Sequence, residues 1–250
     1  MKNTSPKKKN TSISQIQKRI LKTDSLLVDF FGVPKQNPNP QPALEVLIGT
    51  ILSQNTNDKN SFRAFVHLKQ HYNSWKEVSA LTQRALEKEI KVAGLANQKA
   101  KAIKRILTFV EERGEYSMEF LREMDEREAL TLMTSFDGVG VKTASCVLLF
   151  SMKRNVCPVD THVNRTLNRI GVANSQNPEK TFWFLYDILP DGIAHRFHTN
   201  LIRLGREFCI PTNPACSICP VKRVCKYEKK NPDREVKRRY NDFLLLDNLQ

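Results

Sequence analysis

The chain has 250 residues, enough to bury a substantial core in one large domain or two small ones. Its 40 Lys and Arg residues exceed its 26 Asp and Glu residues, and the formal net charge of +14 makes nucleic acid the expected partner class. No apolar run approaches the roughly 20 residues of a membrane span, and no signal peptide is recognisable. We expect a monomer of a reducing compartment with no role at a membrane, cytoplasmic and nucleoid-associated in a bacterium or archaeon and nuclear in a eukaryote.

Apolar residues recur at helical spacing along most of the chain, and alternating strand patterns are nearly absent. In chain order these segments are Ile13–Phe31, Leu44–Leu52, Phe62–Tyr72, Ile103–Val110, Ala129–Phe136, Ala144–Phe150, Val163–Ile170 and Phe182–Leu189. The pattern predicts an all-α protein of about ten short helices. Residues 1–11 are expected to form a basic flexible tail and residues 229–250 a C-terminal tail, whose apolar Phe243–Leu246 could dock on the body.

A glycine-rich turn lies in the segment Phe136–Ala144, just before an apolar helical segment. Glycine permits a tight turn and close backbone approach, and the following helix start presents unpaired N–H groups at a positive dipole end. The segment therefore predicts a phosphate-binding site without sequence preference. Its candidate contacts are Gly138, Val139, Gly140, Val141 and Thr143. A plain corner between two helices is the alternative for such a motif, and a weaker glycine turn of the same kind occurs around Gly94.

Four cysteines near the end of the chain, separated by six, two and five residues, have the spacing of a metal centre rather than of a disulfide framework. They are Cys209, Cys216, Cys219 and Cys225. Four thiolates suit tetrahedral zinc or a cubane iron–sulfur cluster. A single CxxC pair followed at once by proline favours the cluster, because structural zinc usually uses two such pairs. The remaining cysteines, Cys146 and Cys157, lie in apolar surroundings and are expected to be core thiols.

These motifs together resemble the endonuclease III family of DNA glycosylases, within the helix-hairpin-helix superfamily that has a conserved aspartate. The resemblance rests on the GVGxKTA pattern at Gly138–Ala144, on Val159–Val163 about twenty residues later, and on the cysteine spacing. It spans about residues 12–228 and includes Leu52–Asp58. It implies two helical domains that flank a DNA-binding groove, a 4Fe-4S cluster held by the four cysteines, and a partner that is double-stranded DNA with damaged bases or abasic sites.

The resemblance also implies where the domains begin and end. Residues 12–42 and 156–228 would form a discontinuous iron–sulfur cluster domain. Residues 43–155 would form a helical bundle that carries the helix-hairpin-helix motif at about residues 130–150. The N-terminal helix would thus join the cluster region, and the hairpin would belong to the central, continuous part of the chain.

Two residues match the catalytic pair of the family, Lys142 as the lysine and Asp160 as the aspartate. The implied activity is bifunctional: N-glycosylase removal of a damaged base, mainly an oxidised pyrimidine, through a lysine Schiff base, followed by AP lyase nicking through β-elimination. An amine attacks only when it is neutral, and burial, a helix dipole and nearby cations favour that form. Asp160 can stabilise oxocarbenium charge or assist proton transfer; an N-cap is its other role, and the two are compatible.

A base must leave the duplex before this chemistry, and a side chain is expected to fill the gap. Gln54 and Asn55 are the candidates, with loop hydrogen bonding as their alternative role. An ungapped match of the neighbouring residues places Asn55 where the family has its usual glutamine. The chain also departs from the family at Asp137, where proline is customary, and at Val141, where a basic residue is common.

The first cluster loop, residues 210–215, contains no Lys or Arg, although the family often has basic residues there. Candidate replacements for this DNA contact are Arg203, Arg206, Lys222 and Arg223. Other readings are a monofunctional adenine or mismatch-thymine glycosylase, a DNA-binding iron–sulfur protein without turnover, and a zinc-dependent nucleic-acid-binding module. The monofunctional relatives typically carry serine or tyrosine after the hairpin, so Lys142 favours the bifunctional enzyme.

Overall fold

The computed structural model describes residues 6–230, with side chains from Ile13 onward. All regular secondary structure within this range is helical, which confirms the prediction of an all-α fold. No helix in this part of the chain is both long enough and apolar enough to cross a membrane. The described residues form two compact units, one from the chain up to Lys35 together with the chain from Asn155 on, and the other from Gln36–Arg154.

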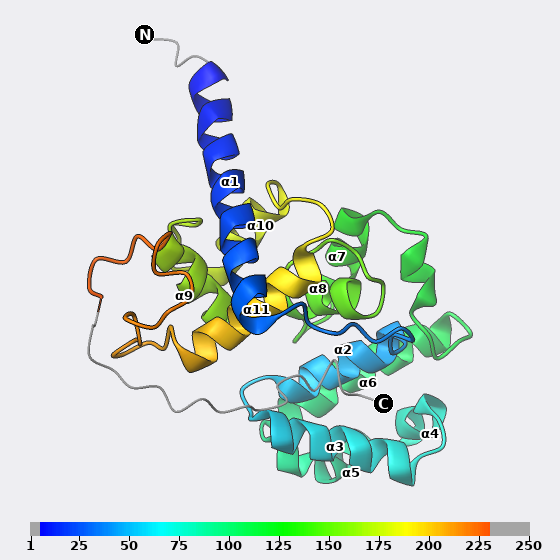
Figure 1. Cartoon of the computed structure of the whole chain (residues 1–250). Coiled ribbons are helices and arrows are strands. Elements are labelled where there is room, and N and C mark those ends of the chain that lie inside the picture. Colours follow the sequence, from blue (N-terminus) through cyan, green and yellow to red (C-terminus); the bar gives the residue numbers. More distant parts are fainter. Residues whose placement is uncertain (1–5, 231–250) are drawn as a thin grey trace. The chain divides into compact units, whose positions relative to one another are not determined.

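The first unit contains the N-terminal helix and the last three helices (Figure 1). Its helices are α1 (Pro6–Phe31), α9 (Thr161–Ile170), α10 (Pro178–Tyr186) and α11 (Ala194–Glu207). Helix α11 packs against both α1 and α9, and α10 packs against α9. Fully buried Phe197 and Leu201 of α11 lie in this core with Ile20 and Leu27 of α1. An irregular segment follows α11 and carries the four cysteines.

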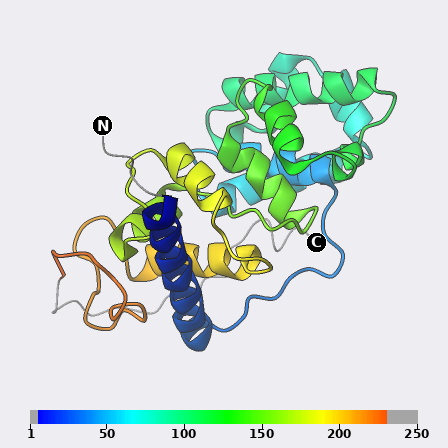
Figure 2. The ribbon, with the colours of Figure 1, turned by 90° about the horizontal axis from the view of Figure 1, so that it is seen from above.

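The second unit is a bundle of helices, shown in light blue to green in Figure 2. Its elements are α2 (Ala43–Ser53), α3 (Asp58–His71), α4 (Trp75–Ala80), α5 (Gln83–Glu89), the 3-10 turn η1 (Lys91–Ala93), α6 (Ala96–Glu112), the 3-10 turn η2 (Glu119–Arg122), α7 (Glu126–Thr134) and α8 (Val141–Phe150). Helix α2 packs against α3, α6 and α8. Its side chains are buried on nearly every face because it is apolar all round, as expected for a central helix.

The ends of these elements partly differ from the sequence predictions. Helix α1 begins at Pro6, so residues 6–11 of the predicted tail are helical. The division between units falls after Lys35, compared with a predicted boundary after residue 42. The segment after Lys35 contacts the second unit, since Lys153 donates a hydrogen bond to the Pro38 carbonyl at 3.2 Å. Residues 231–250, which include the apolar Phe243–Leu246, lie outside the described residues.

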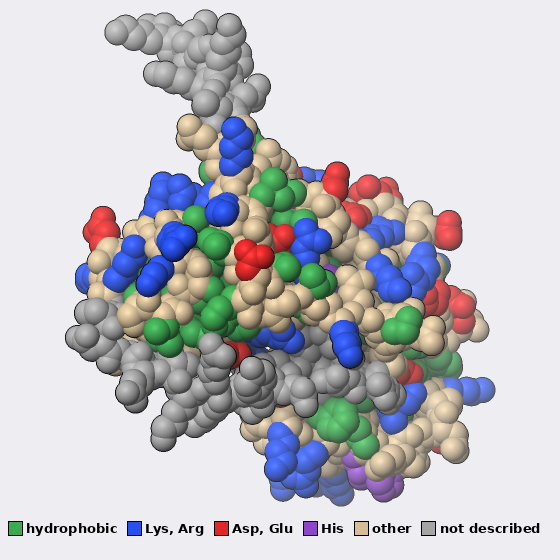
Figure 3. All heavy atoms as spheres, viewed as in Figure 1, with side chains coloured by type: hydrophobic (Ala, Val, Ile, Leu, Met, Phe, Trp, Pro, Cys, Tyr) green, Lys and Arg blue, Asp and Glu red, His purple; other side chains and the backbone are tan. Residues whose placement is uncertain are grey.

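Positive charge extends over the body of the protein. Lys and Arg side chains are spread across the described surface in Figure 3, so the basic character is not confined to the terminal tails. A charge distribution of this kind favours association with a polyanion along an extended surface.

Candidate functional site

The turn between α7 and α8 has the backbone conformation that its glycines predict. Gly138 has φ = +88°, a value that favours glycine, and a Cβ at this position would lie 3.0 Å from the Cβ of Ala102. Gly140 is the extended N-cap residue of α8, and no side chain caps the helix. The backbone N–H groups of the first turn of α8 therefore remain free to bind an anion, as the hairpin motif predicts.

Gln54 connects this hairpin to the turn that follows α2. Its Nε2 donates to the Gly138 carbonyl at 2.9 Å and to Thr143 Oγ1 at 3.2 Å. Thr143 is buried, with 3% of its surface exposed, and its hydroxyl accepts from Gln54, so its side chain is not available to DNA. Val139 is also buried and supports the turn from within. Gln54 is thus held by the protein itself.

Asn55 differs from Gln54 in its exposure and in its hydrogen bonding, the two properties that decide whether a side chain can enter the gap left by a base. Its side chain is exposed, and it makes no hydrogen bond to another residue in the described part of the chain. Its φ of +49° holds it at the tip of the turn, in a left-handed conformation that asparagine tolerates better than most residues. Of the two candidates, Asn55 is therefore the one free to enter a duplex.

The acidic residue before the hairpin, Asp137, forms an ion pair with Arg105 of α6. A negative charge at this position would by itself weaken a phosphate site. The pair is exposed and contributes little to stability, but the guanidinium offsets the carboxylate charge close to the turn. The unusual Asp137 is therefore compatible with anion binding at Gly138 and Gly140.

Lys142 is the second residue of α8, directly after the hairpin. Its side chain is half-buried and has no hydrogen-bond or ion-pair partner among residues 13–230. Its own carbonyl accepts a hydrogen bond from Ser145 Oγ at 2.9 Å, which fixes the backbone of this turn. Lys142 lies in the first turn of α8, at the positive end of the helix dipole. An unpaired amine at this place can act as a nucleophile.

Asp160 lies in the other unit, where it is the N-cap of α9. Its Oδ1 accepts a hydrogen bond from the backbone N–H of Val163 at 2.7 Å. The capping role expected from the sequence is thereby confirmed. The cap also fixes the direction of the carboxylate, and its second oxygen has no hydrogen bond within the described residues. One oxygen can therefore hold the helix while the other acts on a substrate.

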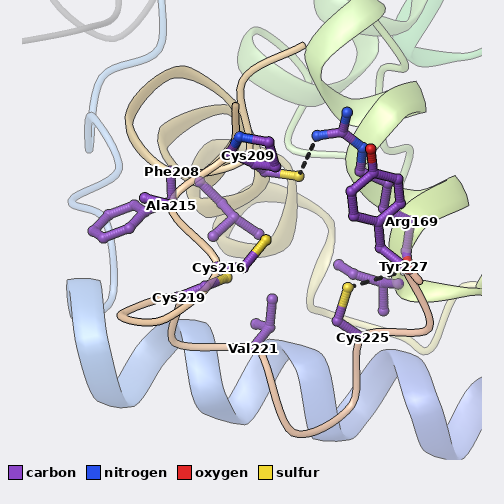
Figure 4. A pocket seen from close by; sticks show the side chains of 12 residues that line it. Arg169, Phe208, Cys209, Ala215, Cys216, Cys219, Val221, Cys225 and Tyr227 are labelled. Atoms are coloured by element: carbon purple, nitrogen blue, oxygen red, sulfur yellow. Dashed lines mark hydrogen bonds between the residues drawn. The ribbon is translucent and has the colours of Figure 1, made fainter. Parts of the chain in front are cut away.

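The four cysteines of the C-terminal segment line a single pocket in the first unit (Figure 4). Cys209 follows α11, and the other three come from the irregular segment. Phe208, Val221 and Tyr227 complete its apolar and aromatic walls. As the side chains stand, no group of three or more His, Cys, Asp or Glu residues within the described range could hold a metal ion. The donor set nevertheless suits an iron–sulfur cluster, because cluster ligands surround a volume and bind separate iron atoms.

Arg169 of α9 forms hydrogen bonds near both ends of the segment that carries the cysteines, at Cys209 and at Cys225. Its guanidinium donates to Cys209 Sγ at 3.4 Å and to the carbonyls of Ile210 and Pro211 at 2.8 Å each, and it lies 4.3 Å from the centre of the Tyr227 ring. Its own carbonyl accepts from Cys225 Sγ at 3.2 Å. Sequence reasoning did not assign this role to Arg169, because the partners lie some forty to sixty residues further along the chain.

The electrostatics of the pocket indicate the kind of group that it suits. Burial, together with the nearby Cys209, Cys225 and Cys216, raises the pKa of the Cys219 thiol to about 12, although a backbone hydrogen bond from Val221 acts to lower it. Burial is also the largest cause of the raised pKa of Cys225. Four thiolates at such a site need a cationic centre to offset their charges. The residues present therefore fit a metal cluster.

The other two cysteines and the basic residues near the pocket can be placed as well. Cys146 and Cys157 are buried, as expected for core thiols. Lys222 and Arg223 are exposed and could reach a phosphate backbone, although Lys222 Nζ also donates to the Ser217 carbonyl at 2.8 Å. Arg203 and Arg206 of α11 are half-buried.

An uncapped glycine hairpin followed by a lysine, in a described fold that is helical and also carries a four-cysteine pocket, is typical of helix-hairpin-helix proteins. The chain belongs to the HhH-GPD superfamily of base excision DNA repair proteins, whose family model matches residues 48–190. Endonuclease III of Thermotoga maritima is 32% identical over 206 residues, which cover 82% of this chain and 92% of that protein. A protein of Arabidopsis thaliana with the provisional name of DNA glycosylase is 36% identical over 197 residues. These residues cover 77% of this chain and 64% of the Arabidopsis protein.

The fold agrees with these relationships. A solved structure of a trapped endonuclease III–DNA covalent intermediate superposes with a TM-score of 0.70 and 25% identity, over 84% of this chain and 95% of the other. The resemblance to endonuclease III is therefore confirmed, and the protein is an endonuclease III-like DNA glycosylase of base excision repair.

Proposed function

We propose that this glycosylase is bifunctional: it removes damaged bases, oxidised pyrimidines first, from double-stranded DNA and then nicks the strand at the abasic site. The observation that carries this proposal is Lys142, a half-buried residue whose amine has no partner among the described residues and which directly follows the uncapped glycine hairpin. A monofunctional glycosylase has no need of an amine at this position. The similar solved structure, named for a covalent endonuclease III–DNA intermediate, supports covalent chemistry.

In the first step, the neutral amine of Lys142 attacks C1′ of the damaged nucleotide. The bond from C1′ to the base nitrogen breaks, and its electron pair leaves with the base, which takes up a proton. Positive charge develops on the sugar as this bond stretches, and the carboxylate of Asp160 stabilises that charge. The attacking nitrogen then loses a proton, and its lone pair forms the C1′=N double bond of the Schiff base as the C1′–O4′ bond breaks and O4′ takes up a proton.

In the second step, the Schiff base makes the C2′ proton acidic. Removal of this proton forms a C1′–C2′ enamine, and its electrons expel the 3′ phosphate as the C3′–O bond breaks. Water then hydrolyses the imine and restores the Lys142 amine. The strand is nicked from the same intermediate that released the base, so one amine accounts for both activities.

The damaged nucleotide must leave the stack, and two exposed turns of the second unit are suited to replace it. Asn55 stands at the tip of the first turn. Leu95 stands at the second, where it is 48% exposed and has φ = +49°. A large apolar residue that is exposed on a turn fits the wedges that proteins insert between base steps. We assign the vacated space to these two side chains; the sequence analysis did not single out Leu95.

Cys209, Cys216, Cys219 and Cys225 would hold a 4Fe-4S cluster, which supplies a fixed, charged cross-link in a segment that lacks regular structure. Within that segment, Arg169 holds the two ends together through its contacts with Cys209 and Cys225. We assign the cluster a structural and DNA-positioning role. The bond-breaking steps belong to Lys142 and Asp160.

The substrate proposal is tested with a panel of duplexes, each with one defined lesion and both strands labelled. We expect release of oxidised pyrimidines together with a nick that leaves a 3′ unsaturated aldehyde. Alkylated purines and mismatched thymine should be poor substrates. Base release without any nick, even at long times, would instead identify a monofunctional enzyme.

A second measurement concerns the metal centre. Protein purified without oxygen should contain about four iron atoms and four sulfides per chain, with the broad visible absorption of a cluster. Substituting Cys219 with alanine should lower both together, because this thiol is one of the four that line the pocket. A colourless protein with one zinc ion per chain would contradict the cluster assignment.

A further inference from the structure

A buried lysine of the second unit has no role in the chemistry described above. Lys99, the fourth residue of α6, has 2% of its surface exposed. Its Nζ donates to the Leu52 carbonyl at 2.8 Å and to the Ala93 carbonyl at 2.8 Å. No carboxylate pairs with it among the described residues, and burial lowers its pKa to about 8. A buried cation without a counterion is costly, so its contacts need an explanation.

Its two partners end two different elements. Leu52 is the penultimate residue of α2, and Ala93 is the last residue of η1. Carbonyls at a helix C-terminus lack intrahelical partners and lie at the negative end of the helix dipole, where a cation is favourable. The tetrahedral ammonium group can serve two such carbonyls at once. Lys99 therefore joins the ends of α2 and η1 at a single nitrogen.

The turns that follow the ends of α2 and η1 are the two exposed turns that carry Asn55 and Leu95. The α2 end leads to Gln54 and Asn55, and Gln54 in turn holds the hairpin through Gly138 and Thr143. The η1 end leads to Gly94 and Leu95, where two successive residues have positive φ, +68° and +49°. Lys99 thus lies at the common base of both turns. It connects to the hairpin through the Leu52 carbonyl, the backbone from Leu52 to Gln54, and the hydrogen bonds of the Gln54 side chain.

We propose that Lys99 is a positioning residue for base extrusion: its ammonium sets the separation of the Asn55 turn and the Leu95 turn, so that both enter the duplex together. The proposal rests on the function proposed above, because it assumes that these turns fill the space left by the base. Lys99 touches neither the sugar nor the base in this account.

The chain offers a matched control on the same helix. Lys104 of α6 also donates to two carbonyls, those of Ser79 and Leu81, at the end of α4. These carbonyls lead to no exposed turn that we assign to DNA. Replacing either lysine by methionine removes two hydrogen bonds from a helix end while keeping an unbranched, apolar side chain. Lys104 is less buried than Lys99, so a merely structural role predicts that each substitution reduces the fluorescence change only in proportion to the protein that is no longer folded.

The experiment uses the full chain and a duplex with 2-aminopurine opposite a non-cleavable abasic analogue, whose fluorescence reports insertion into the gap without turnover. At saturating protein, Lys99→Met should lose most of the wild-type fluorescence change, whereas Lys104→Met should keep it. Single-turnover release of a damaged base should slow by about 10- to 100-fold in Lys99→Met alone, as for a misplaced active-site group. Thermal unfolding checks that both variants are folded at the assay temperature.

Equal fluorescence changes in Lys99→Met and Lys104→Met would overturn the role of Lys99. If Lys99→Met does not fold, Lys99→Gln replaces it; this variant keeps amide donors at a shorter reach and should show a partial loss, whereas a wild-type response would again overturn the proposal. A wild-type protein that inserts into the gap but releases no base and makes no nick would contradict the proposed function alone. Absence of any wild-type fluorescence change would contradict both.

Discussion

Replacing Lys142 by alanine should abolish covalent trapping of abasic DNA by borohydride and slow strand nicking by at least about 1,000-fold, a loss typical of removing a nucleophile. The Nζ atom of Lys142 forms the bond to C1′, and no other group in the proposed chemistry can serve as the nucleophile. Duplex affinity should change much less, because the hairpin N–H groups of α8 stay in place.

Two controls separate loss of the nucleophile from loss of charge or fold. Lys142→Arg keeps the positive charge and should be as inactive as Lys142→Ala, since a guanidinium does not form the Schiff base. Lys101→Ala removes an exposed lysine of α6 and should trap DNA normally. Wild-type trapping and nicking by Lys142→Ala would show that the nucleophile is another residue.

Replacing Asp160 by asparagine should reduce base release by about 100- to 10,000-fold while leaving stability nearly unchanged. Asparagine also caps helices through its side-chain oxygen, so the bond to the Val163 N–H can be kept. Only the negative charge near the sugar is lost. Single-turnover kinetics on the best substrate, together with urea unfolding, measure the two effects separately.

Asp160→Ala is the matched comparison, because it removes the cap as well as the charge. It should lose activity to a similar degree and also lower the free energy of unfolding by about 1 kcal/mol. If Asp160→Asn is fully active whereas Asp160→Ala is impaired only in stability, then Asp160 is a helix cap and nothing more.

Features set by local sequence were the ones that sequence reasoning could predict. The hairpin depends on two glycines and the start of the next helix, all within Phe136–Ala144, and its conformation follows from the low cost of positive φ at Gly138. Asp160 as an N-cap is equally local. The four cysteines were predicted to meet from their spacing alone, and they do line one pocket.

Helix α11 was missed for a physical reason. Its buried side is not purely apolar: His198, Thr199 and Asn200 are buried together with Phe197 and Leu201. A search for apolar residues at helical spacing underestimates such a face, because buried polar side chains do not enter the pattern. His198, for example, bonds through Nδ1 to the Pro158 carbonyl at 2.9 Å.

Long-range contacts decided the roles that the sequence left open. Gln54 and Asn55 are adjacent in sequence, yet only Gln54 is tied to the hairpin, through partners more than eighty residues away. Arg169 and Lys99 are ordinary basic helix residues in the sequence. Their roles follow from which backbone carbonyls the fold brings to them, and that cannot be read from spacing.

The most direct test of the bifunctional mechanism is to identify the residue joined to DNA. Wild-type protein is incubated with a duplex that contains one abasic site, reduced with borohydride, digested, and analysed by mass spectrometry. We predict a single adduct, a reduced sugar fragment on the side-chain nitrogen of Lys142. An adduct on a different residue, or nicking of the strand without any adduct, would contradict the account.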